Sequence, residues 1–149
     1  MARPATGIQA PCPCDDTSLC APISEKYNTE VFGFGADNFE DGEGFDWESM
    51  TTVAWGSGAD LVCEAHTHGV RVIAGVSPPL TDDQDKIADF IASTVASVQE
   101  NFYDGITFDW ENPVDGYDDP LNAYYLDVVT QTTQALKAIN PSYQVRRSE

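Results

Sequence analysis

Short apolar runs alternate with amphipathic stretches along most of this chain, and that alternation constrains the fold more than any other feature. Strands that alternate with helices pair in parallel, because a helix must carry the chain back to the start of the next strand. The sequence therefore predicts an α/β fold built on a parallel sheet. The runs predicted as strands are Glu30–Gly35, Met50–Gly56, Arg71–Val76 and Gly105–Trp110, and a fifth could begin at Ser142–Val145.

Amphipathic stretches with helical spacing separate the later strands. The predicted helices are Ala59–His68, Asp82–Asn101, and a third that opens at Asp119-Pro120 and stops at Asn140. Thr81 and Gln84 match the pattern of a capping box at the start of the second helix. Gly69 is predicted to stop the first helix.

Four strand–helix units are too few to close an eight-stranded (β/α)8 TIM barrel. We therefore predict a truncated barrel, roughly its first four βα units, in other words a half-barrel. Residues 1–29 lack a sustained period and are predicted to form a Cys-rich loop segment, and residues 30–149 to form the partial barrel. The charged ending Arg146–Glu149 stands where an apolar strand should continue, which favours a piece of something longer.

The charge balance excludes several classes of partner. Seven Lys and Arg stand against 25 Asp and Glu, a formal net charge of −18 over 149 residues. Nucleic acids and anionic membranes attract basic patches, so neither partner is expected. No apolar run reaches the length of a membrane span. The charge suits a neutral substrate or an acidic compartment, although simple solubility explains it equally well.

The cysteines indicate an oxidising environment. Three of the four crowd the N-terminal segment (Cys12, Cys14 and Cys20), and Cys63 follows in the first predicted helix. Their spacing does not match a zinc site, so disulfides are predicted, with Cys12 and Cys14 too close to pair with each other. We expect a secreted, lysosomal or vacuolar protein, although Met1–Gly7 has no apolar segment of a signal peptide.

The segment Asp104–Glu111, DGITFDWE, carries the strongest indication of chemistry. Asp109 and Glu111 are two apart at the end of an apolar run, and residues two apart share one face of a strand. Such a strand end is typical of a catalytic site at the mouth of a β/α barrel. Alternation of this kind also occurs in strands that are merely half-exposed.

Two carboxylates suit the hydrolysis of glycosidic bonds. Ordinary retaining and inverting enzymes place the two acids on opposite sides of the scissile bond. Asp109 and Glu111 lie on one strand, hence on one side, so the nucleophile must come from elsewhere. An amide of the substrate itself is one candidate.

The spacing Asp104-Gly105-x-x-x-Asp109-x-Glu111 resembles the signature of glycoside hydrolase family 18, the chitinase-like enzymes, and Pro113 resembles its continuation. Further resemblance covers most of residues 12–145, through CPCDDTSLCAPI, EVFGF, FDWESMTTVAWG and DLVCEAHTHGVRVIAG. The resemblance implies hydrolysis of β-1,4-linked N-acetylglucosamine oligomers, as by a chitinase or chitobiase, without a cofactor or metal.

Roles follow from the resemblance residue by residue. Glu111 would protonate the glycosidic oxygen, and Asp109 would orient the N-acetyl group whose carbonyl attacks the anomeric carbon. Asp104 would be a structural or charge-relaying acid. Thr107 stands where the family usually has a further acid, a departure that we interpret as tuning. Later family residues, a Tyr and a Trp that contact the sugar, have no counterpart in this chain, so we expect weak or no activity from it alone.

Aromatic residues near strand ends are weaker candidates. Phe34 and Trp55 could stack on sugars, whereas Trp110 should pack outward because of its parity.

His66 and His68 suit the charge of a helix end better than a metal, and Asp37–Glu48 resembles a calcium loop only loosely.

Two further readings stay open. A non-catalytic, chitin-binding or lectin-like relative would share the fold, and a broken gene could yield a non-functional product. Unpaired strand edges in a half-barrel would also favour self-association.

Overall fold

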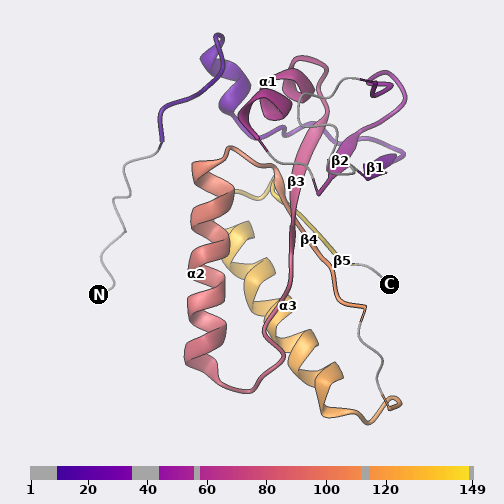
Figure 1. The fold of residues 1–149 in the computed structure, drawn as a ribbon, viewed down its shortest axis with the longest axis vertical. Helices are drawn as coiled ribbons and strands as arrows, with labels where there is room; N and C mark the ends of the chain where they lie inside the picture. Colours follow the sequence, from indigo (N-terminus) through magenta and orange to yellow (C-terminus); the bar gives the residue numbers. More distant parts are fainter. Residues whose placement is uncertain (1–9, 35–43, 56–57, 112–114, 148–149) are drawn as a thin grey trace.

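A five-stranded parallel sheet organises the molecule (Figure 1). The structure is a computed structural model, and it describes residues 10–34, 44–55, 58–111 and 115–147. The strands lie in chain order, each paired in parallel with the next. They are β1 (Phe32–Phe34), β2 (Thr52–Ala54), β3 (Arg71–Val76), β4 (Gly105–Phe108) and β5 (Gln144–Arg147). This parallel order is what the alternating sequence predicts.

Among the described residues, three helices and one short 3-10 turn complete the fold. They are η1 (Thr17–Cys20), α1 (Ala59–Thr67), α2 (Gln84–Glu100) and α3 (Pro120–Ile139). In Figure 1, α2 and α3 run side by side, and α1 and η1 lie together at the end of the sheet where β3 and β4 begin. Within the described ranges, no helix combines the length and apolarity that crossing a membrane requires.

The helix boundaries follow local capping chemistry. Asp119 caps α3 by accepting a hydrogen bond from the amide of Leu121, and Pro120 occupies the first turn, as predicted. Gly69 has a φ of 71° just after α1, which confirms it as the stop. The capping box predicted from Thr81 and Gln84 is wrong. Asp83 is the N-cap of α2, because its carboxylate reaches the amides of Asp85 and Lys86.

The two faces of the sheet are different. Phe108 of β4 is fully buried, and its ring contacts Phe90 of α2 and Tyr125 of α3. On the opposite face, Thr52 of β2 donates a hydrogen bond to Gln144 of β5 over 3.2 Å, although two strands lie between them. The sheet therefore curls so that side chains of distant strands meet on its concave face. This is the predicted half-barrel.

Gly105 allows β4 and β5 to pair closely. Its φ is +147°, and a Cβ atom at this position would overlap the backbone carbonyl of Gln144. Only glycine tolerates both conditions. The second residue of the DGITFDWE segment therefore has a structural reason of its own.

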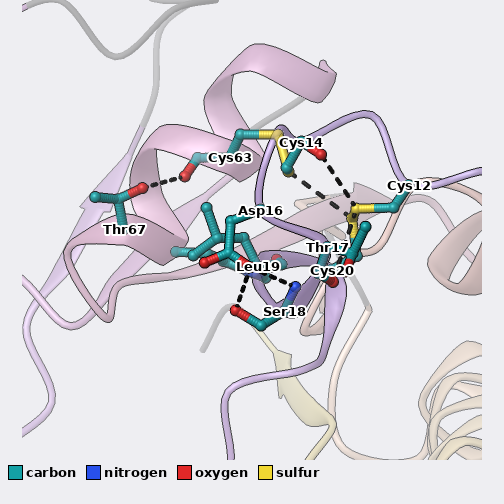
Figure 2. Close-up of a disulfide and its surroundings, with 10 residues drawn as sticks. Cys12, Cys14, Asp16, Thr17, Ser18, Leu19, Cys20, Cys63 and Thr67 are labelled. Carbon is teal, nitrogen blue, oxygen red and sulfur yellow. Dashed lines mark hydrogen bonds between the residues drawn. A yellow bond between two sulfur atoms is a disulfide. The ribbon is translucent and has the colours of Figure 1, made fainter.

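Two disulfides hold the N-terminal segment, which confirms the prediction that the four cysteines form disulfides. Cys12 bonds to Cys20, which closes a short loop around η1, and Cys14 bonds to Cys63 of α1 (Figure 2). As predicted, Cys12 and Cys14 do not pair with each other. The sulfur atoms of Cys12, Cys14 and Cys20 lie within 4.8 Å of one another, but each is committed to a disulfide and offers no thiolate to a metal.

Candidate active site

The two predicted acids lie at the carboxyl end of β4, a strand paired on both sides. Asp109 follows the last strand residue, and its amide donates a hydrogen bond to the carbonyl of Val76 in β3 over 3.0 Å. Asp109 is half-buried, and Glu111 is exposed. Strand β4 itself is buried throughout, so it presents these acids from a fixed base.

The parity predicted for this segment agrees with the packing. Trp110 lies against Tyr125 of α3 with ring centroids 4.7 Å apart, on the same side as Phe108. Alternation along the strand then directs Thr107 toward the concave face. Thr107 is 7% exposed and is paired in register with Gly75 of β3. Trp110 is accordingly a packing residue, as expected.

Asp109 has an unusual environment for a carboxylate. Its Oδ1 atom is buried, and within the described residues no hydrogen-bond donor reaches it. A buried carboxylate oxygen is costly without a partner, so it favours the approach of a donor. The hydroxyl of Tyr125 is likewise buried, and it has no hydrogen-bond partner among the described residues. Burial raises the pKa of Tyr125, the charge of Arg147 opposes this effect, and the charge of Asp109 adds to it.

Two exposed aromatic rings meet beyond β1 and β2. Phe34 and Trp55 are 62% and 43% exposed, and their rings contact edge to face at 5.2 Å. Trp55 has a φ of 62° at the end of β2, and its ring lies over Gly75, where an added Cβ would approach Cδ1 to 2.7 Å. Gly75 of β3 is the register partner of Thr107 in β4. The ring of Trp55 therefore lies over the strand next to β4, on the concave face of the sheet.

Asp104 lies apart from Asp109 and Glu111, at the opposite end of β4. It is fully buried, and its carboxylate accepts hydrogen bonds from the amides of Ile23 and Val72 over 2.7 and 2.8 Å. A third bond comes from Nε2 of His66 over 2.7 Å. Four strand residues separate Asp104 from Asp109, so Asp104 does not join them in one cluster.

His66 is the partner that sequence reasoning missed. It is 7% exposed on α1, and its Nδ1 atom faces the carbonyl of Leu19. Burial alone would lower the pKa of His66, but the hydrogen bond and charge of Asp104 and the bond to Leu19 outweigh it and hold that pKa above its usual value. Nothing in the sequence spacing joins positions 66 and 104; only the fold does.

The remaining predicted sites are dispersed. His68, at the C-terminal end of α1, pairs with Glu64 over 3.0 Å, whereas His66 pairs with Asp104, so the two histidines have different partners. Most of the calcium-like segment 37–48 and the motif residue Pro113 fall outside the described residues.

Comparison with curated proteins gives several relatives of one kind. The chain is 33% identical over 90% of its length to "Probable di-N-acetylchitobiase 2" of Dictyostelium discoideum. It is 37% identical over 70% of its length to "Di-N-acetylchitobiase" of Rattus norvegicus, and 33% identical over 72% to the Bos taurus protein of that name. No family model and no solved structure matches the chain.

The chain spans only part of these relatives. It covers 35% of the Dictyostelium protein, 29% of the rat protein and 63% of the bovine one. The similarity relates this chain to chitobiase-like proteins.

Proposed function

We propose that this chain carries the proton-donor half of a glycosidase of the chitobiase or chitinase type, a member of glycoside hydrolase family 18 that acts on β-1,4-linked N-acetylglucosamine oligosaccharides. The observation that carries the proposal is the carboxyl end of β4. It presents an exposed acid, Glu111, beside Asp109, whose buried Oδ1 has no donor among the described residues. In this proposal, residues 30–149 form the partial catalytic barrel and residues 1–29 a Cys-rich segment.

Glu111 acts as the general acid. Its exposure lets it reach the glycosidic oxygen of a sugar that lies across the carboxyl end of the half-barrel. Proton donation to that oxygen assists departure of the leaving sugar. Asp109 accepts a hydrogen bond from the N–H of the acetamido group of the substrate. That bond turns the acetamide carbonyl toward the anomeric carbon, and the carboxylate stabilises the positive charge of the oxazolinium ion that forms. Water then opens this ion with retained configuration.

The other predicted residues take supporting roles. Phe34 of β1 and Trp55 at the end of β2 provide an exposed aromatic surface on which a sugar ring can stack, and the ring of Trp55 reaches Gly75 of β3, the neighbour of β4. Thr107 lies beneath Asp109 as a neutral neighbour on the concave face. Asp104, which makes its contacts at the far end of β4, acts as a structural acid and contributes through the position of the strand.

The disulfides support passage through an oxidising compartment, and a secreted, lysosomal or vacuolar location follows as part of the proposal. No cofactor or metal is needed, because the attacking group belongs to the substrate. Neither nucleic acid nor a membrane is a partner in this proposal.

Binding preference tests the proposal without relying on turnover by this chain alone. Titration with chitotriose should shift the nuclear magnetic resonance signals of the Asp109 amide and the Trp55 indole. Cellotriose has the same linkage and lacks the acetamide, so it should bind at least about tenfold more weakly if Asp109 accepts the acetamide N–H. Equal affinity for both sugars, or no binding of either, contradicts the proposal.

Asp109→Asn is the matched variant for this experiment. The amide has the shape of the carboxylate but presents a donor as well as an acceptor. The preference for chitotriose over cellotriose should shrink, and stacking on Trp55 should remain.

A further inference from the structure

The contacts of His66 require more protons than a neutral imidazole has. Nδ1 faces a carbonyl oxygen, that of Leu19, and Nε2 faces the carboxylate of Asp104. Both neighbours only accept hydrogen bonds, and a neutral imidazole carries a single N–H. The observed arrangement therefore fits the doubly protonated ring. The Asp104 carboxylate also accepts hydrogen bonds from the backbone amides of Ile23 and Val72, and its Oδ2 lies 2.7 Å from Nε2 of His66.

This pair connects segments that are distant in the sequence. Leu19 and Ile23 belong to the N-terminal segment, His66 to α1, Val72 to β3 and Asp104 to the start of β4. The side chains of His66 and Asp104 are 2% and 0% exposed, so water cannot replace a lost partner. The Leu19–His66 and Ile23–Asp104 bonds fix the N-terminal segment at the base of the sheet, and the Cys14–Cys63 disulfide also joins that segment to α1.

We propose that His66 and Asp104 form a pH-dependent clamp, which holds residues 19–23 at the base of the sheet while His66 is doubly protonated and loses one of its two ring hydrogen bonds when His66 gives up a proton. The clamp acts at the end of β4 opposite to Asp109 and Glu111, and it does not depend on the proposed enzymatic activity. It makes the attachment of the N-terminal segment tighter in acid than in mild alkali.

The direction follows from linkage. A group whose pKa is higher in the folded than in the unfolded state stabilises the fold fully below its unfolded pKa, about 6.5 for histidine, and this contribution is lost as the pH rises through the folded value. The pKa of His66 is raised in the fold, so the clamp weakens above neutral pH.

The two tyrosines near the pair do not change charge in this range. Tyr27 and Tyr143 feel the charge of Asp104, and burial raises the pKa of both, so they stay neutral. Arg71 of β3 is permanently charged and pairs with Glu30. On α1 itself, His68 pairs with Glu64 at the surface.

Hydrogen exchange and nitrogen chemical shifts of the whole 149-residue chain test the clamp. In the unmodified protein near pH 5.5, both ring nitrogens of His66 should carry protons, and one should be lost with a midpoint above that of a free imidazole. Protection of the Ile23 amide, corrected for the intrinsic exchange rate, should fall between pH 5.5 and pH 8.5, because the clamp weakens as the pH rises through the raised pKa of His66.

Two variants sharpen the test. His66→Gln keeps hydrogen-bonding capacity but does not titrate, so the pH dependence of Ile23 protection should disappear. His68→Gln removes the exposed histidine two residues on and should behave as the unmodified protein. If His66→Gln does not fold, the unmodified protein decides alone. A singly protonated His66 at pH 5.5, constant Ile23 protection across this pH range, or loss of the pH dependence in His68→Gln would each overturn the clamp.

Discussion

At the scale of single residues, the proposed chemistry is concentrated in one exposed carboxylic acid. Glu111 lies shortly after a buried strand, separated from it by Asp109 and Trp110, and its own side chain is exposed at the carboxyl end of the sheet. This combination gives a general acid a fixed backbone and free access to a ligand. An exposed acid at this position is also compatible with a protein that only binds sugar, so a substitution must distinguish catalysis from binding.

Glu111→Gln should abolish hydrolysis and preserve binding. Glutamine has the size of glutamate but has no proton to give to the glycosidic oxygen, and loss of general acid catalysis typically lowers rates by about 10²–10⁴-fold. Release of a fluorogenic group from a chitobioside measures the rate, and chitotriose titration measures binding. The chain alone should be weakly active at most, so the assay needs high protein concentration.

Asp118→Asn is the control for that substitution, because Asp118 is an exposed acid in the following loop. It should change neither rate nor affinity. Equal and detectable hydrolysis by Glu111→Gln and the unmodified chain would remove Glu111 from the mechanism.

The sequence could indicate Asp109 and Glu111, because their spacing is local and strand alternation decides which face they share. It could not indicate that Asp104 would leave this group, or that His66 would bond to it. Both depend on α1 packing against the start of β4, a contact between residues 38 positions apart. The burial of Asp109 Oδ1, without a donor among the described residues, is also a consequence of packing.

At the scale of secondary-structure elements, two glycines on neighbouring strands have different tasks. Gly105→Ala should destabilise the protein by about 3 kcal/mol, because a methyl group would collide with the backbone of β5 at an unfavourable φ. Urea unfolding, followed by circular dichroism, measures this change. Stability close to that of the unmodified protein would show that β5 does not pair as tightly as described.

Gly75→Ala is the matched substitution on β3. Its methyl group would meet the ring of Trp55, which is 43% exposed and can swing outward. The free energy of unfolding should fall by less than in Gly105→Ala, and chitotriose affinity should decrease because Trp55 is displaced. Unchanged affinity would remove Trp55 from the proposed sugar surface.

The disulfides also act on elements, and their loop lengths rank their contributions. Cys14–Cys63 closes 49 residues and Cys12–Cys20 closes eight. If restriction of the unfolded chain dominates, replacing the first pair by serine should cost about 4 kcal/mol and replacing the second about 2.5 kcal/mol. Urea unfolding of the two double variants gives the comparison. The reverse order would indicate that the short loop around η1 is the more important of the two.

Element boundaries were predictable where one local rule decided them. Asp119 and Pro120 specify the start of α3 without help from the rest of the chain. The start of α2 was misplaced because Thr81 and Asp83 can both cap a helix. Asp83 is closer to the first turn and reaches its amides, whereas the Thr81 hydroxyl accepts a bond from Asp83 instead.

At the scale of the whole molecule, strand order follows from the alternation of strands and helices, and the curl of the sheet does not. Parallel pairing with short crossovers leaves few arrangements. The curl appears in contacts such as Thr52 with Gln144, which join strands that are not neighbours. The described sheet has β1 at one edge and β5 at the other, with no strand paired outside either of them.

These two edges and the strong negative charge have opposite effects on association. Unpaired backbone groups on β1 and β5 favour pairing with another chain, whereas a net charge of −18 keeps like molecules apart. Salt screens the repulsion between exposed charges and leaves hydrogen bonding between edges nearly unchanged. The chain alone should therefore be largely monomeric at low ionic strength and should associate as salt is added.

Sedimentation velocity at about 0.01 M and about 1 M salt measures the change, since the screening length falls roughly tenfold between them. A substitution to proline in β5, Val145→Pro, removes one amide and should reduce association at high salt without altering the monomer at low salt. Association that weakens as salt is added would show that charged groups, and not strand edges, hold the chains together.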